Sequence, residues 1–146
     1  MKYQNILKRG GAVLVGLAMT LILSSSQAEE RQVDVDKLPP AATKTGVTYA
    51  KDIKTIFDKS CTGCHGEKRD KARLRLDSLE HIMAGSKHGA VIVPGKSEKS
   101  VLLRNIANLP DDEDDWMPPK DNKAKIAPLT KEQVSLVRAW VEQGAK

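Results

Sequence analysis

The stretch that most constrains this chain runs from Cys61 to Gly66 and reads Cys-Thr-Gly-Cys-His-Gly. It contains the only two cysteines among the 146 residues and one of the three histidines. Two cysteines separated by two residues and followed directly by a histidine have the spacing of a c-type haem attachment site. In such a site Cys61 and Cys64 form thioethers with one haem, and His65 ligates its iron. The motif therefore predicts one covalent haem c, around which the rest of the chain folds.

Three other uses of these residues remain open on sequence grounds. A disulfide between Cys61 and Cys64 suits an oxidising compartment, although a disulfide has no need of the adjacent His65. A zinc site needs four ligands, so it would have to add His81 or His88. A thioredoxin-like dithiol should follow a strand in a βαβ pattern, whereas the apolar periodicity before this motif predicts a helix.

The N-terminal segment, residues 1–28, has the pattern of a secretory signal peptide. Basic residues precede an apolar run over residues 12–23, and small residues lead to a cleavage site after Ala28. The alternative is that the segment is retained and tethers the protein to a membrane. The segment holds three of the 24 basic residues and none of the 19 acidic ones, which leaves residues 29–146 with a net charge of +2. That charge is too small for a nucleic-acid-binding surface, so we expect a periplasmic or otherwise exported protein without a nucleic-acid partner.

Downstream of the signal, the pattern changes from polar to periodic. Residues 29–46 are polar and contain two consecutive prolines, which predicts a linker or extended arm. Apolar residues with a helical period follow, which predicts a series of helices. The expected helices cover residues 49–59, 79–84, about 98–108 and 131 to about 144. Ser78, Ser97 and Thr130 are the expected N-caps, and Thr130 and Gln133 have the spacing of a capping box.

A sixth ligand for the iron has to come from outside the motif. The candidates in residues 29–146 are Met83, Met117, His81 and His88. Two prolines follow Met117 and fix its backbone, and a thioether is a neutral, soft ligand that raises the reduction potential. Met83 and His81 share a short predicted helix too close to the motif to reach the other haem face easily. Met117 is the favoured ligand, and His88, in a glycine-flanked loop, is the better histidine rival.

The second ring nitrogen of His65 needs a hydrogen-bond acceptor. The Pro94 carbonyl, in the turn Val93-Pro94-Gly95, is one candidate, and the alternative is that Pro94 only shapes that turn.

The charged segment over residues 67–75 is expected to be a solvated loop near the haem. A sharper hypothesis is that Arg73 or Arg75 contacts a haem propionate, because guanidinium groups pair well with carboxylates. The acidic run Asp111–Asp115 is also expected to be a solvated loop.

The ordered set of these motifs resembles the class I cytochrome c family, and within it the planctomycete-type cytochrome c domains. The resemblance covers residues 47–146 and rests on the haem motif together with Leu74–Ser78, Val93–Gly95, Ser100–Leu103, Met117–Lys120 and Leu136–Ala145. It implies a small all-α cytochrome c fold, with the first and last helices packing beside the covalent haem, and His65 and Met117 as axial ligands. The chain departs from the family at Lys68–Arg73, which is more basic than the family's glycine-containing loop.

With both axial positions filled, the iron would change oxidation state without binding a substrate. We therefore expect a monomeric electron carrier, not an enzyme, that exchanges single electrons with redox proteins through small, transient contacts. A haem-based gas sensor or enzyme is the alternative, and it requires an open sixth position. A zinc- or disulfide-stapled interaction module is the third interpretation.

Overall fold

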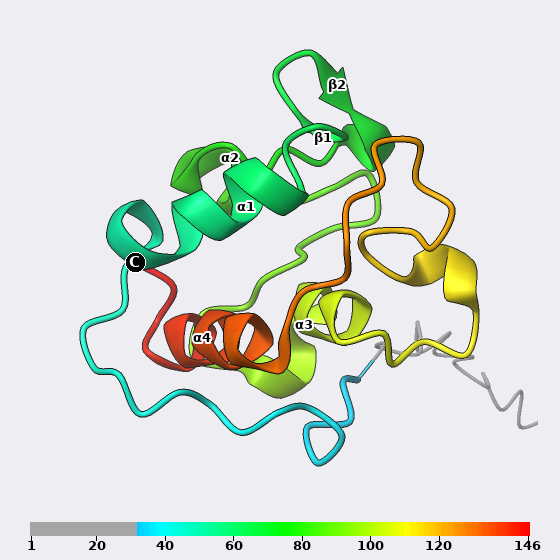
Figure 1. Ribbon diagram of the computed structural model, residues 1–146. Helices are drawn as coiled ribbons and strands as arrows, with labels where there is room; N and C mark the ends of the chain where they lie inside the picture. Colours follow the sequence, from blue (N-terminus) through cyan, green and yellow to red (C-terminus); the bar gives the residue numbers. More distant parts are fainter. Residues whose placement is uncertain (1–31) are drawn as a thin grey trace, which may run out of the picture.

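The computed structural model describes residues 32–146, so the expected signal segment lies outside the described residues. The described part is rich in helix (Figure 1). Its α-helices are α1 (Lys54–Ser60), α2 (Leu79–Ala84), α3 (Val101–Ile106) and α4 (Lys131–Glu142). A π-helical turn, η1 (Tyr49–Ile53), leads into α1, and three 3-10 turns are η2 (Lys71–Arg73), η3 (Ser97–Lys99) and η4 (Glu113–Asp115).

A small antiparallel hairpin is present in addition to the expected helices. Its strands are β1 (His65–Gly66) and β2 (Arg69–Asp70), with His65 opposite Asp70 and Gly66 opposite Arg69. Each strand has only two residues, which is too short to show the alternating pattern by which strands are recognised in a sequence. The fold is therefore helix-rich with a two-stranded sheet, and the sheet begins inside the predicted haem motif.

The hydrophobic core joins the first and last helical segments. η1 packs against α4, and the rings of Tyr49, Phe57 and Trp140 lie 6.2 or 6.3 Å apart between centroids. Phe57 and Trp140 are fully buried. The two rings with polar atoms both form hydrogen bonds. The Tyr49 hydroxyl donates to the Leu76 carbonyl and Trp140 Nε1 donates to the Lys146 carbonyl, both at 3.0 Å. Burial raises the pKa of Tyr49 to about 12.

Two helices begin at the predicted caps. The Ser78 side chain accepts a hydrogen bond from the His81 amide at the start of α2, and α2 ends at Gly85, whose φ is 79°. The Thr130 side chain and Gln133 form the predicted capping box at the start of α4. The predicted helix over residues 49–59 is present as η1 followed by α1, with a π-helical first turn.

The predicted helix over residues 98–108 is wrong over residues 98–100, because Ser100 interrupts it, and α3 ends at Ile106. The φ and ψ of Ser100 are −93° and 88°, so η3 and α3 are separate. The Ser100 hydroxyl accepts from the Val93 amide at 2.9 Å and donates to the Lys96 carbonyl at 2.8 Å. Ser97, the expected cap, donates its hydroxyl to Glu142 on α4 instead. A side chain that bonds nearby backbone groups competes with the helical ladder, which accounts for the break.

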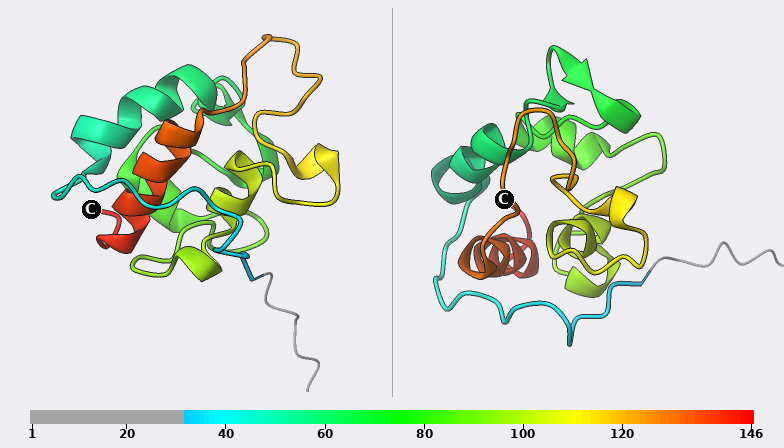
Figure 2. Two further views of the ribbon diagram at one scale, coloured as in Figure 1. Left: turned by 60° about the horizontal axis from the view of Figure 1, so that its bottom comes forward. Right: turned by 45° about the vertical axis from the view of Figure 1, so that its right-hand side comes forward.

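The segment before the helices lies along α4 (Figures 1 and 2). Arg138 Nη1 on α4 donates to the carbonyls of Val35 and Pro39, at 3.2 and 3.0 Å. Val33 and Leu38 are buried in the core. Residues 32–46 are thus an extended arm without helix or strand, attached to the outside of α4.

Between residues 32 and 146, no helix has the length and hydropathy that crossing a membrane requires.

Candidate functional site

The cysteine–histidine motif continues directly from the end of α1 as a tight turn. The amides of Cys61 and Thr62 both donate to the Phe57 carbonyl, and the amides of Cys64 and His65 both donate to the Cys61 carbonyl. Gly66 closes the turn and is buried. A Cβ atom on Gly66 would lie 2.5 Å from the Thr62 carbonyl oxygen, so only glycine fits. The packing of α1 therefore determines where both thiols and the imidazole lie.

Both cysteines carry free thiols, and both residues are half-buried. Burial, and to a smaller extent the neighbouring Cys64, raises the pKa of the Cys61 thiol to about 12. No group of three or more His, Cys, Asp or Glu side chains within residues 32–146 is placed to hold a metal ion. The zinc interpretation therefore gains no support from this geometry.

The imidazole of His65 is placed by the hairpin. Nδ1 lies 3.1 Å from the Lys71 carbonyl oxygen, and the His65 carbonyl accepts from the Leu76 amide at 2.7 Å. Burial lowers the pKa of His65, and its contacts with the Lys71 and Leu74 backbone offset this only in part. The ring is therefore neutral at neutral pH. A neutral ring that donates through Nδ1 keeps a lone pair on Nε2, which is the form in which histidine ligates a metal.

The carbonyl beside His65 belongs to Lys71, and not to Pro94 as the sequence suggested. Pro94 is exposed, and its turn is attached elsewhere, since the Gly95 amide donates to the Val141 carbonyl on α4 at 2.8 Å. The hairpin accounts for the difference, because it returns the chain to the motif within six residues and so provides a nearer acceptor.

Met117, the favoured sixth ligand, lies half-buried against the hydrophobic core that Cys61 also contacts. Its amide donates to the carbonyl of Asn105 in the last turn of α3, at 3.0 Å. Trp116 Nε1 just before it donates to the Pro110 carbonyl at 2.9 Å. Asn122 just after it bonds the Pro119 carbonyl and both backbone groups of Ile126, at 2.7–2.8 Å. The loop around Met117 is therefore fixed at both ends.

The rival ligands have other surroundings. His81 Nδ1 lies 2.9 Å from Asp77 Oδ1, Met83 is 37% exposed, and His88 is exposed in the loop closed by the Ser86–Gly89 bridge. Of the two methionines, Met117 is the more buried and the better anchored.

The two arginines proposed for propionate contacts differ. Arg75 Nε lies 3.2 Å from both carboxylate oxygens of Asp77. That ion pair, followed by the hydrogen bond from His81, lowers the pKa of Asp77 to about 2. Arg73 is exposed, with a φ of 55°. Arg75 therefore already has an acid partner in the protein, while Arg73 is the more accessible of the two.

Two residues beyond the predicted set contribute to this region. Asn122 bridges Pro119 and Ile126 in the loop after Met117 through its side-chain hydrogen bonds. Asn108 follows α3 with a φ of 56°, a conformation that asparagine tolerates well at helix C-termini. Its Oδ1 is the one buried side-chain polar atom within residues 32–146 that lacks a hydrogen-bond partner. Sequence patterns do not reveal either role, because both depend on contacts of the folded loop.

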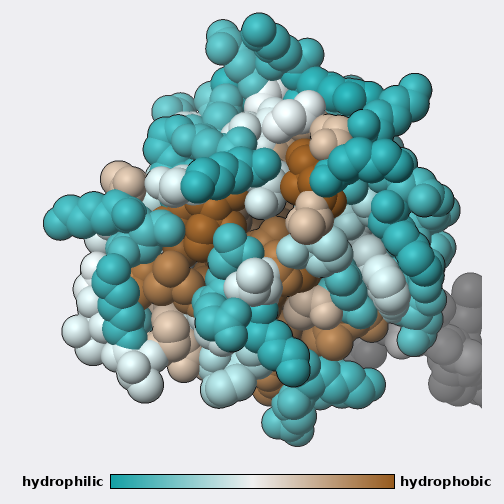
Figure 3. Space-filling view, in the orientation of Figure 1, coloured by the Kyte–Doolittle hydropathy of each residue, from teal (hydrophilic) through white to brown (hydrophobic). Residues whose placement is uncertain are grey.

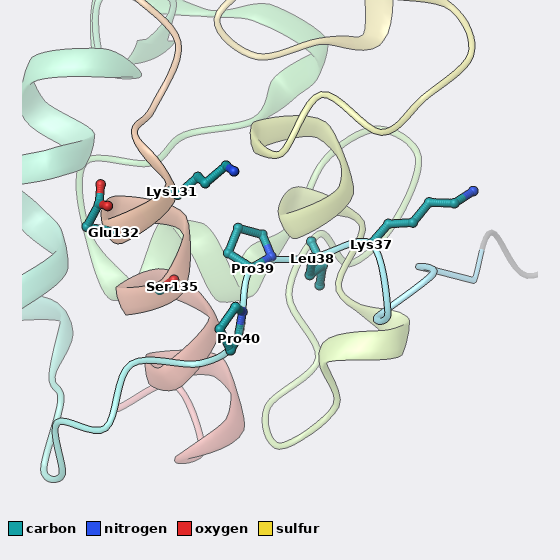
Figure 4. A pocket seen from close by; sticks show the side chains of 7 residues that line it. All are labelled: Lys37, Leu38, Pro39, Pro40, Lys131, Glu132 and Ser135. Carbon is teal, nitrogen blue, oxygen red and sulfur yellow. The ribbon is translucent and has the colours of Figure 1, made fainter.

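A surface hollow of about 370 Å³ lies between the arm and α4 (Figure 4). It is lined by Lys37, Leu38, Pro39, Pro40, Lys131, Glu132 and Ser135. None of the motif residues lines it, so it is separate from the predicted haem site. Apolar surface is visible elsewhere, in the middle of the face drawn in Figure 3, with polar residues around it.

Comparison with known families gives one match. The model of the family described as Planctomycete cytochrome C matches residues 61–121. Residues 61–121 are therefore similar to a cytochrome c segment. The match confirms the resemblance seen in the sequence over the segment that runs from the motif past Met117. Comparison with curated proteins and with solved structures found no match.

A cytochrome c segment implies covalently bound haem c, and the residues of this chain fit that group. Cys61 and Cys64 offer two free thiols, and His65 offers a neutral imidazole with Nδ1 already hydrogen-bonded. Met117 offers a neutral thioether on a fixed loop. This donor set of one imidazole and one thioether suits haem iron, and does not suit hard cations such as calcium.

Proposed function

We propose that this protein is an exported monohaem cytochrome c that carries single electrons between redox proteins. Cys61 and Cys64 hold the haem, while His65 and Met117 ligate its iron. The observation that carries this proposal is that the family match starts at Cys61 and extends past Met117. Both halves of the proposed coordination site therefore fall within the cytochrome c segment.

In this proposal His65 and Met117 have different roles as ligands of the iron. His65 ligates through Nε2, and the Lys71 carbonyl orients its ring. Met117 would supply the second axial ligand, and the bond from its amide to the Asn105 carbonyl fixes the backbone that carries the sulfur. The bound haem supplies the reversible one-electron couple. A closed coordination sphere favours electron transfer over substrate binding, which is why we propose a carrier and not an enzyme.

The proposal extends to location and assembly. We expect residues 1–28 to direct export and to be removed near Ala28, and the mature protein to act as a monomer in the periplasm. If the N-terminal segment is retained instead, the same domain would act at the membrane surface.

Absorption spectroscopy of the holoprotein tests the ligand set. The oxidised wild type should show the weak far-red band of methionine–iron ligation, and the reduced wild type should bind carbon monoxide poorly. Met117→Ala should lose the band and bind carbon monoxide readily. The matched control is Met83→Ala, which changes the exposed methionine and should leave both readouts unchanged.

Two results would contradict the proposal. A far-red band that survives in Met117→Ala would show that another residue is the sixth ligand. Ready carbon monoxide binding by the reduced wild type would show an open position and favour the gas-sensor alternative.

A further inference from the structure

Five exposed basic residues from two loops come together beside the haem motif. We call them the basic rim: Lys68, Arg69, Lys71, Arg73 and Lys87. The first four belong to the hairpin and to η2, which follows it. Lys87 comes from the loop after α2, and its amide donates to the Ala72 carbonyl at 2.8 Å. That bond ties the two loops, so the rim is a continuous surface and not a chance feature of one charged run.

Ion pairs neutralise some cations of this protein, but they do not neutralise the rim. Ion pairs with acidic side chains are made, among others, by Lys37, Lys44, Lys54, Arg75, Lys120 and Arg138. No ion pair of the described residues involves the basic rim. The two hairpin carboxylates, Glu67 and Asp70, offset two of the five positive charges, so the rim retains an excess of positive charge.

The rim is bonded directly to the residues that would carry the haem. The Lys71 amide donates to the Cys64 carbonyl at 3.1 Å, and the Lys71 carbonyl lies 3.1 Å from His65 Nδ1. A partner that contacts Lys71 is thus one residue away from the imidazole on the iron. The exposed acidic run Asp111–Asp115 lies on another part of the surface, beyond α3 (Figure 1). An acidic partner would be attracted by the rim and repelled by that run, which limits its orientation.

We propose that the basic rim is the docking surface for the redox partner, and that the partner presents a negatively charged protein face to it. This inference rests on the proposed electron-carrier function and adds the side from which electrons enter or leave. The partner approaches on the His65 side of the haem, next to the hairpin. The contact is guided by charge and brief, as suits a carrier that must dissociate after each transfer.

Two small redox reagents of opposite charge test the proposal on the holoprotein. Hexacyanoferrate(III), an anion, takes one electron from the reduced protein and becomes hexacyanoferrate(II). Tris(phenanthroline)cobalt(III), a cation, takes one electron and becomes the cobalt(II) complex. Stopped-flow rates are measured for the wild type, for Lys68→Glu/Arg69→Glu, and for the control Lys51→Glu/Lys96→Glu. The control makes the same change in net charge at two exposed lysines away from the hairpin.

We expect the rim variant to react on the order of tenfold more slowly than the control variant with the anion at low ionic strength. With the cation it should react faster than the control. Both differences should fade as salt shortens the screening length. Equal rates for the rim and control variants would overturn the proposal. So would rim-dependent binding to phosphatidylglycerol vesicles without a rate difference, because it would identify a membrane as the occupant.

The outcomes also separate this inference from the function on which it rests. If the protein has the far-red band and is oxidised by both reagents but shows no rim effect, only the docking surface is wrong. If the protein holds no haem or binds carbon monoxide readily when reduced, the proposed carrier function fails first.

Discussion

Replacing Ser100 with alanine should destabilise the protein more than any other single hydroxyl deletion in its region. Ser100 is fully buried. Its hydroxyl accepts from the Val93 amide and donates to the Lys96 carbonyl. The Lys96 carbonyl keeps a second partner, the Lys99 amide, but the Val93 amide would be left unsatisfied. Leaving a buried donor unsatisfied costs about 1–3 kcal/mol, and the other lost bond adds about 1 kcal/mol.

The expected loss for Ser100→Ala is therefore about 2–4 kcal/mol, a large part of the roughly 5–15 kcal/mol that stabilises a small domain. The matched control is Ser97→Ala. Ser97 is also buried, but its hydroxyl makes a single bond to Glu142, and Glu142 keeps its ion pair with Arg138. The control should lose only about 1 kcal/mol.

Urea unfolding of the holoproteins measures both changes. The midpoint should fall while the slope stays constant, since neither variant alters the surface exposed on unfolding. Ser100 sets the start of α3, and α3 holds Met117 through Asn105. Ser100→Ala should therefore also weaken the far-red band at a lower urea concentration than the control. A loss for Ser100→Ala no greater than that for Ser97→Ala would refute this reasoning.

Further predictions concern the strained and charged segments near the motif. Ala72 has a φ of 58°, where glycine is unstrained, so Ala72→Gly should raise the free energy of unfolding by about 1 kcal/mol. Ala84→Gly, in α2, should lower it, and a loss in both would refute the strain argument. Asp77 has a pKa of about 2, below its usual 3.8, so its contribution to stability is present above about pH 4 and is lost as pH falls towards 2. Asp77→Asn should therefore lose less stability than the wild type between pH 4 and pH 2 in an acid titration followed by circular dichroism. An equal loss would show that the ion pair with Arg75 does not persist in solution.

Local sequence signals predicted the parts of the fold that depend on local bonds. The caps at Ser78 and Thr130 join residues three apart, and both are present. Ser100 could not be predicted as a helix breaker, because its bond to the Val93 amide spans seven residues and exists only once the Pro94 turn has folded. The arm is the extreme case, since Arg138 bonds carbonyls about 100 residues earlier in the chain.

In the candidate site, too, the sequence predicted the local features and not those that depend on the folded chain. The motif itself could be read from residue order, because the chemistry of Cys61, Cys64 and His65 depends on their spacing alone. The acceptor for His65 could not, because the Lys71 carbonyl is a backbone group placed by a hairpin whose strands are too short to leave a pattern. The anchorage of Met117 to Asn105 is likewise a backbone bond, between a loop and the last turn of α3.

The central claim is that residues 61–121 hold one haem through Cys61 and Cys64, and intact-mass measurement of the exported protein under denaturing conditions tests it most directly. With haem-attachment machinery present during expression, we predict the mass of residues 29–146 plus one haem. Cys61→Ala/Cys64→Ala should show the polypeptide mass alone. A wild-type mass without haem, whether as free thiols or as a Cys61–Cys64 disulfide, would contradict the account.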